Sequence, residues 1–298
     1  MRSEPRTDPQ APVLVLGATG GQGGAVLRAL RERRRKVRAL VRDPTAPSAR
    51  RLAAEGIELA AGGFTERDAL AAAMNGVVAA FALTTPFESG VDAELVQGRA
   101  ILGAAADAGL PHLVFASVAG ATSGSGVPHF ESKAVVEREL AGGDLPYTVV
   151  APTYFYDNAL GGEREILDGV LALPLPADHP LQQLDRGDLG RFVAEVLDAP
   201  ARYTAQRIEL AGDDPTPQQM ASALAAASNR PVRHEEVPMA AVRRGSADMA
   251  AMWEFLRGDG YQVDIAALRR DHPDIGWTSF ASWADRTFAG GGIQPSPS

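Results

Sequence analysis

A glycine-rich segment near the N-terminus has the residue types and spacing of a loop that binds phosphates. It runs Gly17-Ala-Thr-Gly20-Gly21-Gln-Gly23-Gly24 and directly follows the apolar run Val13–Leu16. Glycine frees the backbone for a tight turn and lets a pyrophosphate approach closely. A helix beginning at this point would offer its unpaired amides and positive dipole end to the phosphates. The alternative is a structural turn, but the position between a strand and a helix favours a nucleotide site.

The residues after the next apolar run, Val37–Val41, bear on the choice of nucleotide. Sites that select NAD place an acidic residue about 20 residues beyond the glycines, where it binds the ribose 2′-hydroxyl. Here the first residue after the run is Arg42, followed by Asp43. A guanidinium can hold a 2′-phosphate through two charge-assisted hydrogen bonds, so Arg42 favours NADP(H). An exposed Arg42 paired with Asp43 is the alternative, and Asp43 leaves NAD open.

These candidate residues lie within a regular alternation of strands and helices. Short apolar runs predict strands at 13–16, 37–41, 57–61, 77–83, 112–116 and 147–151. The segments between them predict helices at 20–35, 48–55, 67–74, 91–108 and 132–140. Repeated units of this length indicate an α/β fold, a Rossmann-type doubly wound parallel sheet with helices on both faces.

The alternation becomes less regular after Pro152. We expect helices at 189–197, 217–227 and 239–257, and strands at 207–210 and 232–237. The predicted organisation is a disordered tail (1–11), a nucleotide-binding domain (12–155), a smaller C-terminal α/β lobe (156–288) and a flexible tail (289–298). Because no linker separates them, the lobe should pack on the sheet and return some segments to it.

Composition excludes several classes of function. The net charge of −8 is opposite to that of most proteins that grip nucleic acid, so we expect no nucleic-acid partner. The chain has no cysteine, which rules out disulfides and thiolate chemistry, and its five histidines lack metal-binding spacing. No stretch is long and apolar enough to be a signal peptide or to span a membrane. We expect a cytoplasmic protein without a metal. The sequence does not decide between a monomer and an oligomer.

Several motifs together resemble the NmrA-like family of atypical short-chain dehydrogenases/reductases, over residues from Val13 to about Phe288. They are the glycine loop, Val41-Arg-Asp-Pro44, His129-Phe-Glu-Ser-Lys133 with Val136-Glu137, Leu145-Pro-Tyr-Thr148 with Pro152-Thr-Tyr-Phe-Tyr-Asp-Asn158, and Gly276-Trp-Thr-Ser-Phe280 with Trp283. The resemblance implies a Rossmann domain, bound NADP(H), and a cleft between the domain and the lobe for a small-molecule acceptor. Some relatives are NADPH-dependent reductases of quinones, imines or phenylpropanoids. Others are nucleotide sensors that bind a regulatory protein partner.

The resemblance also assigns cofactor contacts. Thr19 and Gln22 would contact phosphate and ribose, Gly63 and Phe64 would flank the adenine, and Lys133 would hold the nicotinamide ribose. The implied cofactor-binding set is Gly17, Thr19, Gly20, Gly21, Gln22, Gly23, Arg42, Gly63, Phe64, Thr84, Thr85, Pro86, Lys133 and Pro152. Thr84, Thr85 and Pro86 follow an expected strand, so a simple turn is the alternative for them. The alternative for Lys133 is a solvated helix lysine.

The candidate catalytic residues depart from the usual pattern. Most short-chain reductases use Tyr-x-x-x-Lys, in which the phenol supplies a proton, but here His129 stands in the tyrosine position before Lys133. His129 could donate the proton itself, or it could be a structural or solvent-facing histidine. Tyr154 or Tyr156 could reach the acceptor instead, or the acceptor could need no protein acid. Ser117, after the fifth strand, matches a position that often holds a catalytic hydroxyl, although it could simply cap the strand.

Two functional hypotheses follow. The first is an NADPH-dependent reductase of a small apolar acceptor such as a quinone, imine, enone or ketone. The second is a non-catalytic NADP(H) redox sensor that regulates a protein partner. The missing tyrosine favours the sensor, whereas Lys133 and the tyrosine-rich segment after Pro152 favour the reductase.

Overall fold

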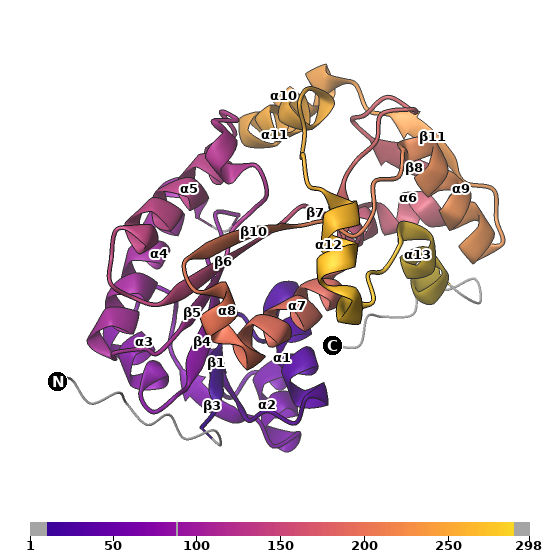
Figure 1. Ribbon diagram of the computed structural model, residues 1–298. Coiled ribbons are helices and arrows are strands. Elements are labelled where there is room, and N and C mark those ends of the chain that lie inside the picture. The colour runs from indigo at the N-terminus through magenta and orange to yellow at the C-terminus, as the bar shows by residue number, and fades with distance from the viewer. Residues whose placement is uncertain (1–10, 88, 289–298) are drawn as a thin grey trace. The chain divides into compact units, whose positions relative to one another are not determined.

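A computed structural model describes residues 11–87 and 89–288 of the chain (Figure 1). Both expected tails, 1–11 and 289–298, lie outside the described residues except for Ala11. No helix in the described part is long and apolar enough to cross a membrane.

The six strands β1 to β6 of the N-terminal half and the later strand β10 form one seven-stranded sheet. Its strand order is β10-β6-β5-β4-β1-β2-β3. The five strand pairs between β6 and β3 are parallel. The strands are β1 (Val13–Val15), β2 (Val37–Val41), β3 (Glu58–Ala61), β4 (Ala79–Leu83), β5 (Leu113–Ala116), β6 (Tyr147–Pro152) and β10 (Gln206–Leu210). The chain moves from β1 outward to β3, then crosses back to β4 on the other side of β1. Nucleotides bind at such a reversal, beyond the carboxyl ends of the strands.

Helices cover both faces of this sheet, as expected from the sequence. Figure 1 shows α3 (Arg67–Met74), α4 (Gly90–Asp107) and α5 (Pro128–Ala141) on one side, and α1 (Gly21–Glu32), α2 (Pro47–Ala54) and α7 (Arg186–Asp198) on the other. Glycines bring neighbouring helices together. A Cβ on Gly98 of α4 would lie 2.5 Å from Cγ2 of Val136 in α5. A Cβ on Gly190 of α7 would lie 2.4 Å from the carbonyl oxygen of Ala25 in α1.

The remaining elements are shorter and more irregular. Two small parallel sheets pair β7 (Tyr154–Phe155) with β9 (Gln183–Leu184) and β8 (Val170–Leu173) with β11 (Arg233–Glu236). The helices are α6 (Glu163–Leu167), α8 (Pro200–Tyr203), α9 (Pro217–Ser228), α10 (Met239–Gly245), α11 (Ala247–Arg257), α12 (Ile265–Asp271) and α13 (Phe280–Phe288), with 3₁₀ turns η1 (Ala121–Ser123), η2 (Tyr156–Gly162) and η3 (Pro273–Ile275).

One predicted helix is wrong in its continuity. The segment 239–257 forms α10 and α11 rather than one helix, because Ser246 adopts an extended conformation with φ −159°. Its hydroxyl accepts a hydrogen bond from the Met249 amide at 3.2 Å and so caps α11. Gly245 therefore ends α10, and Ser246 is the N-cap of α11. The apolar periodicity continues through both residues, so it did not indicate the break.

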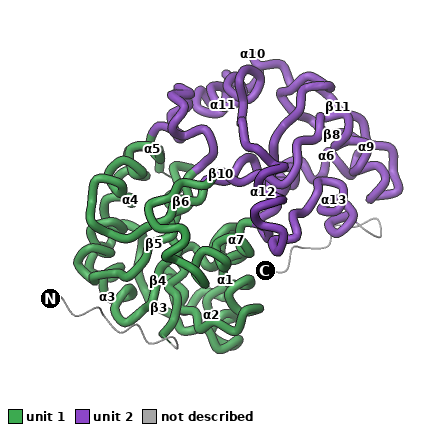
Figure 2. The backbone as a smooth tube through the Cα atoms, in the orientation of Figure 1, with its two compact units in different colours: residues 1–117, 132–150, 189–208 green, residues 118–131, 151–188, 209–298 purple. Residues whose placement is uncertain are grey.

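The chain divides into two compact units whose segments alternate along the sequence. Unit 1 comprises residues 1–117, 132–150 and 189–208, and unit 2 comprises 118–131, 151–188 and 209–298 (Figure 2). Each unit therefore contains three stretches of the chain. Unit 1 has the strands of the nucleotide-binding fold from β1 to β5 and the helices α1 to α4, whereas unit 2 has most of the C-terminal half.

Candidate functional site

The glycine loop connects β1 to α1 in a conformation that requires glycine at two positions. Gly17 has φ +66°, and a Cβ there would lie 3.1 Å from Cδ2 of Leu83 at the end of β4. A Cβ on Gly23 would lie 2.3 Å from the carbonyl oxygen of Gly17, so α1 crosses the strand end at backbone contact. The loop therefore lies at the carboxyl edge of the sheet, between β1 and β4, where the strand order reverses.

The beginning of α1 is open for an anion. Its N-cap is Gly20, which has no side chain to bind the first amides, and its first turn contains no acidic residue. Thr19, Gly20 and Gly21 are exposed. The side-chain oxygen Oε1 of Gln22 is buried without a hydrogen-bond partner. Free amides suit a pyrophosphate and an unpartnered acceptor suits a ribose hydroxyl, so this cradle fits a dinucleotide.

The residues expected around the adenosine end lie at the ends of β2 and β3. Arg42 is exposed directly after β2. The Asp43 carboxylate accepts hydrogen bonds from the Thr45 hydroxyl at 2.7 Å and the Thr45 amide at 2.8 Å, and these bonds lower the pKa of Asp43. Gly63 and Phe64 follow β3, and Cζ of Phe64 lies 3.9 Å from the Cβ position of Gly17.

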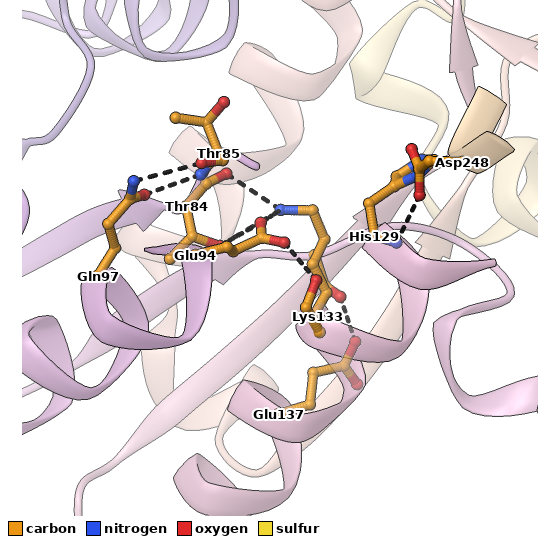
Figure 3. Close-up of polar contacts among 10 residues, drawn as sticks. Thr84, Thr85, Glu94, Gln97, His129, Lys133, Glu137 and Asp248 are labelled. Atoms are coloured by element: carbon orange, nitrogen blue, oxygen red, sulfur yellow. Dashed lines mark hydrogen bonds and ion pairs between the residues drawn. The ribbon is translucent and has the colours of Figure 1, made fainter. Parts of the chain in front are cut away.

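A buried ionic network holds Lys133 at the end of β4. Its ammonium donates to the Thr84 carbonyl oxygen at 3.0 Å and to the Glu94 carboxylate at 2.6 Å. The Glu94 side chain is fully buried and also accepts from the hydroxyls of Thr84, at 2.8 Å, and Ser132. Figure 3 shows Glu94 reaching from α4 towards the Lys133 ammonium. Lys133 is therefore a fixed, buried cation rather than a solvated helix lysine.

The same face of α4 fixes the next residue of the loop. The Thr85 amide donates to Oε1 of Gln97 at 3.0 Å, and Nε2 of Gln97 donates to the Thr85 carbonyl oxygen at 3.3 Å (Figure 3). Glu94 and Gln97 are three residues apart on the helix, so they project side by side. Together they hold the segment Thr84-Thr85, which leads into the buried Pro86, at the carboxyl edge of unit 1.

Ser117 belongs to a second buried network in unit 1. Its hydroxyl donates to Oε1 of Glu137 on α5, and the Arg207 guanidinium donates to Oε2 of Glu137 at 2.7 Å. Both Ser117 and Glu137 are buried. The Ser117 proton is thus engaged by a carboxylate that is itself held by an ion pair.

Tyr154 and Tyr156 lie in unit 2 and differ in environment. The Tyr154 ring is half-buried against Trp253, with a centroid separation of 5.5 Å, and burial raises the pKa of Tyr154 to about 12. Tyr156 is fully buried and donates its hydroxyl hydrogen to the Thr278 carbonyl oxygen at 2.9 Å. Burial also raises the pKa of Tyr156, so both phenols hold their protons tightly. Pro152, at the end of β6, is buried.

His129 lies in the first turn of α5 and contacts a carboxylate distant in sequence. Its Nδ1 is 2.7 Å from Oδ2 of Asp248, and its backbone amide donates to Oδ1 of the same residue at 3.1 Å. The helix that we expected at 132–140 begins four residues earlier, at Pro128, which places His129 and Lys133 one turn apart on one helix.

Sequence reasoning missed four polar residues that hold the candidate site residues. Glu94 and Gln97 lie within a helix that was expected, and their spacing with Ile101 could have shown that they lie on its buried face. Glu137 was noted only as part of a motif. Nothing in the sequence connects Asp248 to His129, because 119 residues separate them.

The fold and the open glycine cradle define an α/β protein of the Rossmann type with a dinucleotide-binding loop. The model of the NmrA-like family matches residues 9–273, so the chain belongs to that family. Among curated relatives, the NAD(P)H azoreductase of Xenophilus azovorans is 30% identical over 80% of this chain and 81% of its own length. Quinone oxidoreductase 2 of Escherichia coli strain K12 is 28% identical over 89% of this chain and 87% of its own length.

Solved structures support the fold. The triphenylmethane reductase of Citrobacter sp., complexed with NADP(H), has a TM-score of 0.78 and 22% identity, covering 93% of this chain and 99% of that one. NmrA, a negative transcriptional regulator in complex with NADP, has a TM-score of 0.75 and 23% identity, covering 94% of this chain and 96% of that one. The same fold therefore serves both enzymes and a regulator.

Proposed function

We propose that this chain is an NADP(H)-dependent reductase that transfers a hydride to a small apolar acceptor. The cofactor is NADP(H). The observation that carries the proposal is the juxtaposition of the open glycine cradle and a buried, oriented lysine at one sheet edge. Gly17 approaches Leu83 at the end of β4, and Thr84, the next residue, binds the Lys133 ammonium. A module that only bound phosphates would need the cradle but not the buried cation.

Each candidate residue then has a defined task. The first amides of α1, at Gly21 and Gln22, would bind the pyrophosphate, and the unpartnered Gln22 oxygen would accept from a ribose hydroxyl. Gly63 and Phe64 flank the adenine, and Arg42 binds the 2′-phosphate. The bound cofactor supplies a hydride from its nicotinamide ring.

On the nicotinamide side, Lys133 donates to the ribose hydroxyls while Glu94 keeps its charge compensated. Thr84, Thr85 and Pro86 would bound the ring on the side of unit 1. The ammonium has close bonds to the Thr84 carbonyl oxygen and to Glu94, and a longer contact of 3.3 Å to the Thr84 hydroxyl oxygen. The proton in that longest contact is the one that would turn to a ribose hydroxyl.

The relatives favour quinones and azo compounds as acceptors. The azoreductase and the quinone oxidoreductase both match at least four-fifths of this chain. Imines, enones and ketones form the rest of the acceptor range that an NADPH-dependent reductase of this family would take.

A second candidate function is that of a non-catalytic NADP(H) sensor that regulates a protein partner. His129 in place of tyrosine supports it, and so does the engagement of the Ser117 and Tyr156 hydroxyls by other groups. The likeness to the regulator NmrA supports it at the level of the fold.

NADPH consumption against a panel of quinones, azo compounds, imines, enones and ketones separates the two functions. Lys133→Met should lower turnover and weaken NADPH binding, and Lys36→Ala, at an exposed lysine, serves as the matched control. Turnover by the wild type that falls only in Lys133→Met supports the reductase. Tight NADPH binding without reduction of any acceptor contradicts it and favours the sensor.

A further inference from the structure

The Asp248 carboxylate holds two different groups of His129. Oδ1 accepts the backbone amide of His129 in the first turn of α5, and Oδ2 lies 2.7 Å from the ring nitrogen Nδ1. Figure 3 shows the contact between the carboxylate and the ring. The first bond caps a helix, and it would be satisfied by one oxygen. The second bond orients the imidazole, which the cap does not require.

This contact fixes which ring nitrogen can exchange a proton. An ionised carboxylate only accepts hydrogen bonds, so Nδ1 of His129 carries a hydrogen. Nε2 is then the ring nitrogen through which a proton would be donated, and the carboxylate keeps the ring in one orientation. When Nε2 releases its proton, the ring remains neutral in a single tautomer, still bound to Asp248.

The surroundings of the pair suit proton donation. His129 is 5% exposed, and its ring packs edge-on against Phe130 with a centroid separation of 4.9 Å. Exclusion of water strengthens the hydrogen bond between the ring and the carboxylate. The Asp248 side chain is 30% exposed, which gives the pair a connection to solvent for replacement of the proton. His129 also lies one turn from Lys133 on α5.

We propose that His129, positioned by Asp248, is the proton donor of the reductase, and that its natural acceptors are neutral molecules that need a proton together with the hydride. This inference rests on the proposed function. Conversion of a quinone to a hydroquinone adds one hydride and one proton, and conversion of an azo bond to a hydrazine does the same. The proton leaves Nε2 of His129, and solvent then restores it. A cationic triphenylmethane dye takes up the hydride alone and becomes neutral.

The difference between the two acceptor classes provides an internal control. Menadione, a neutral quinone, and malachite green, a cationic triphenylmethane dye, are each reduced at saturating NADPH by the wild type, His129→Gln and Asp248→Asn. Glu254→Gln, an exposed carboxylate on the same helix as Asp248, is the matched control. General acid catalysis contributes about 10²–10⁴-fold. The menadione-to-dye rate ratio should therefore fall by about 10²-fold or more in His129→Gln.

Asp248→Asn tests the positioning role apart from the cap. Its amide oxygen can still accept from the His129 backbone, but its amide nitrogen donates to Nδ1 and moves the ring hydrogen to Nε2. The ratio should fall in this variant too. At a pH where the ring is neutral, the ¹⁵N resonances of His129 should change from the Nδ1–H to the Nε2–H tautomer, which shows that Asp248 sets the position of the ring hydrogen. The accompanying fall in the ratio shows that the reaction uses it. Glu254→Gln should retain both the ratio and the tautomer.

The outcomes distinguish failure of the proton-donor role of His129 from failure of the proposed reductase function. Equal ratios in the wild type and His129→Gln overturn the proton-donor role while the reductase stands, as does a wild type that reduces only the dye. If only menadione is reduced, its rate in His129→Gln is compared with its rate in Glu254→Gln. Equal rates then overturn the proton-donor role. Failure of the wild type to reduce either compound contradicts the reductase itself, and the donor role falls with it.

Discussion

Arg42 is the residue on which the choice of NADP(H) over NAD depends. It is exposed at the end of β2, while the neighbouring Asp43 carboxylate is bonded to Thr45 within its own turn. That turn occupies the carboxylate which an NAD-selective site would direct at the ribose 2′-hydroxyl. The local geometry therefore adds to the argument from residue type.

We predict that Arg42→Ala weakens NADPH binding roughly 10- to 100-fold and leaves NADH binding almost unchanged. A charge-assisted hydrogen bond contributes about 1.5–3 kcal/mol. NADH has no 2′-phosphate, so its binding does not depend on this bond. Fluorescence titration with both nucleotides measures the effect, and Arg50→Ala, at an exposed arginine on α2, is the control. Equal weakening of NADPH and NADH binding would refute the 2′-phosphate contact.

The Lys133–Glu94 pair leads to a second prediction at the residue scale. Lys133→Met strands a fully buried carboxylate and should lower the free energy of unfolding by about 3–5 kcal/mol at neutral pH. Adding Glu94→Gln removes the stranded charge and should restore most of that loss. NADPH binding should stay weak in both variants, because both lack the ammonium. Urea unfolding and NADPH titration measure the two effects, and strictly additive destabilisation would contradict the coupling.

At the scale of elements, the contact between β1 and α1 is the most constrained part of the nucleotide-binding loop. Gly23→Ala would place Cβ 2.3 Å from the Gly17 carbonyl oxygen and 2.6 Å from that of Leu16. Neither oxygen can move without disrupting the strand end, so we predict a loss of about 3 kcal/mol in stability and of NADPH binding. Thermal unfolding and nucleotide titration measure both.

Gly24→Ala is the comparison for this prediction. Its Cβ would lie 3.3 Å from the nearest atom, the Ala18 carbonyl oxygen, and alanine favours a helix by about 1 kcal/mol. This variant should retain nearly wild-type stability. Equal damage from the two substitutions would show that general helix crowding, rather than the crossing at Gly23, sets the constraint.

Periodicity predicted the strands and helices of the nucleotide-binding fold because each signal is local. The strand at 37–41 and the helix at 67–74 have the predicted bounds. Prediction was poorer after residue 152, where strands as short as β7 and β9 contain too few residues to show alternation. The split between α10 and α11 was missed because one serine outweighs an apolar pattern that continues through it.

The sequence predicted the glycine loop of the candidate site but not the residues that orient its side chains. The glycine loop has a sequence signal because backbone contact excludes every other residue. The partners that orient Lys133 and His129 have none, since a buried carboxylate such as Glu94 has the residue type of a solvated one. Burial is a property of the folded chain, and only the structure shows it.

At the scale of the whole molecule, the chain passes repeatedly between its two compact units. Residues 189–208 return to unit 1 after a long excursion through unit 2. Within unit 1, α7 then packs on α1 at backbone contact through Gly190. The nucleotide-binding unit is therefore completed late in the sequence, and its stability depends on contacts between distant segments.

His112 is one of the residues that join such segments. It is buried just before β5, and its Nε2 lies 2.9 Å from the Thr148 hydroxyl oxygen on β6. Thr148 donates its hydrogen to the Tyr203 carbonyl oxygen at 2.9 Å, so it can only accept from His112. The imidazole is consequently a neutral donor inside the fold, and burial lowers the pKa of His112 from 6.5 to about 4.

This shift predicts an acid limit to the stability of the whole molecule. Between pH 6.5 and 4 the unfolded chain binds a proton at His112 that the folded chain does not, so the free energy of unfolding falls as pH falls. The full contribution is about 3 kcal/mol, from about 1.4 kcal/mol per pH unit. Urea unfolding at intervals across this range should show that His112→Asn loses much less stability on acidification than the wild type, whereas His272→Asn, at a half-exposed histidine, behaves as the wild type does. A His112→Asn curve parallel to that of the wild type would mean that other groups, not this buried imidazole, limit stability in acid.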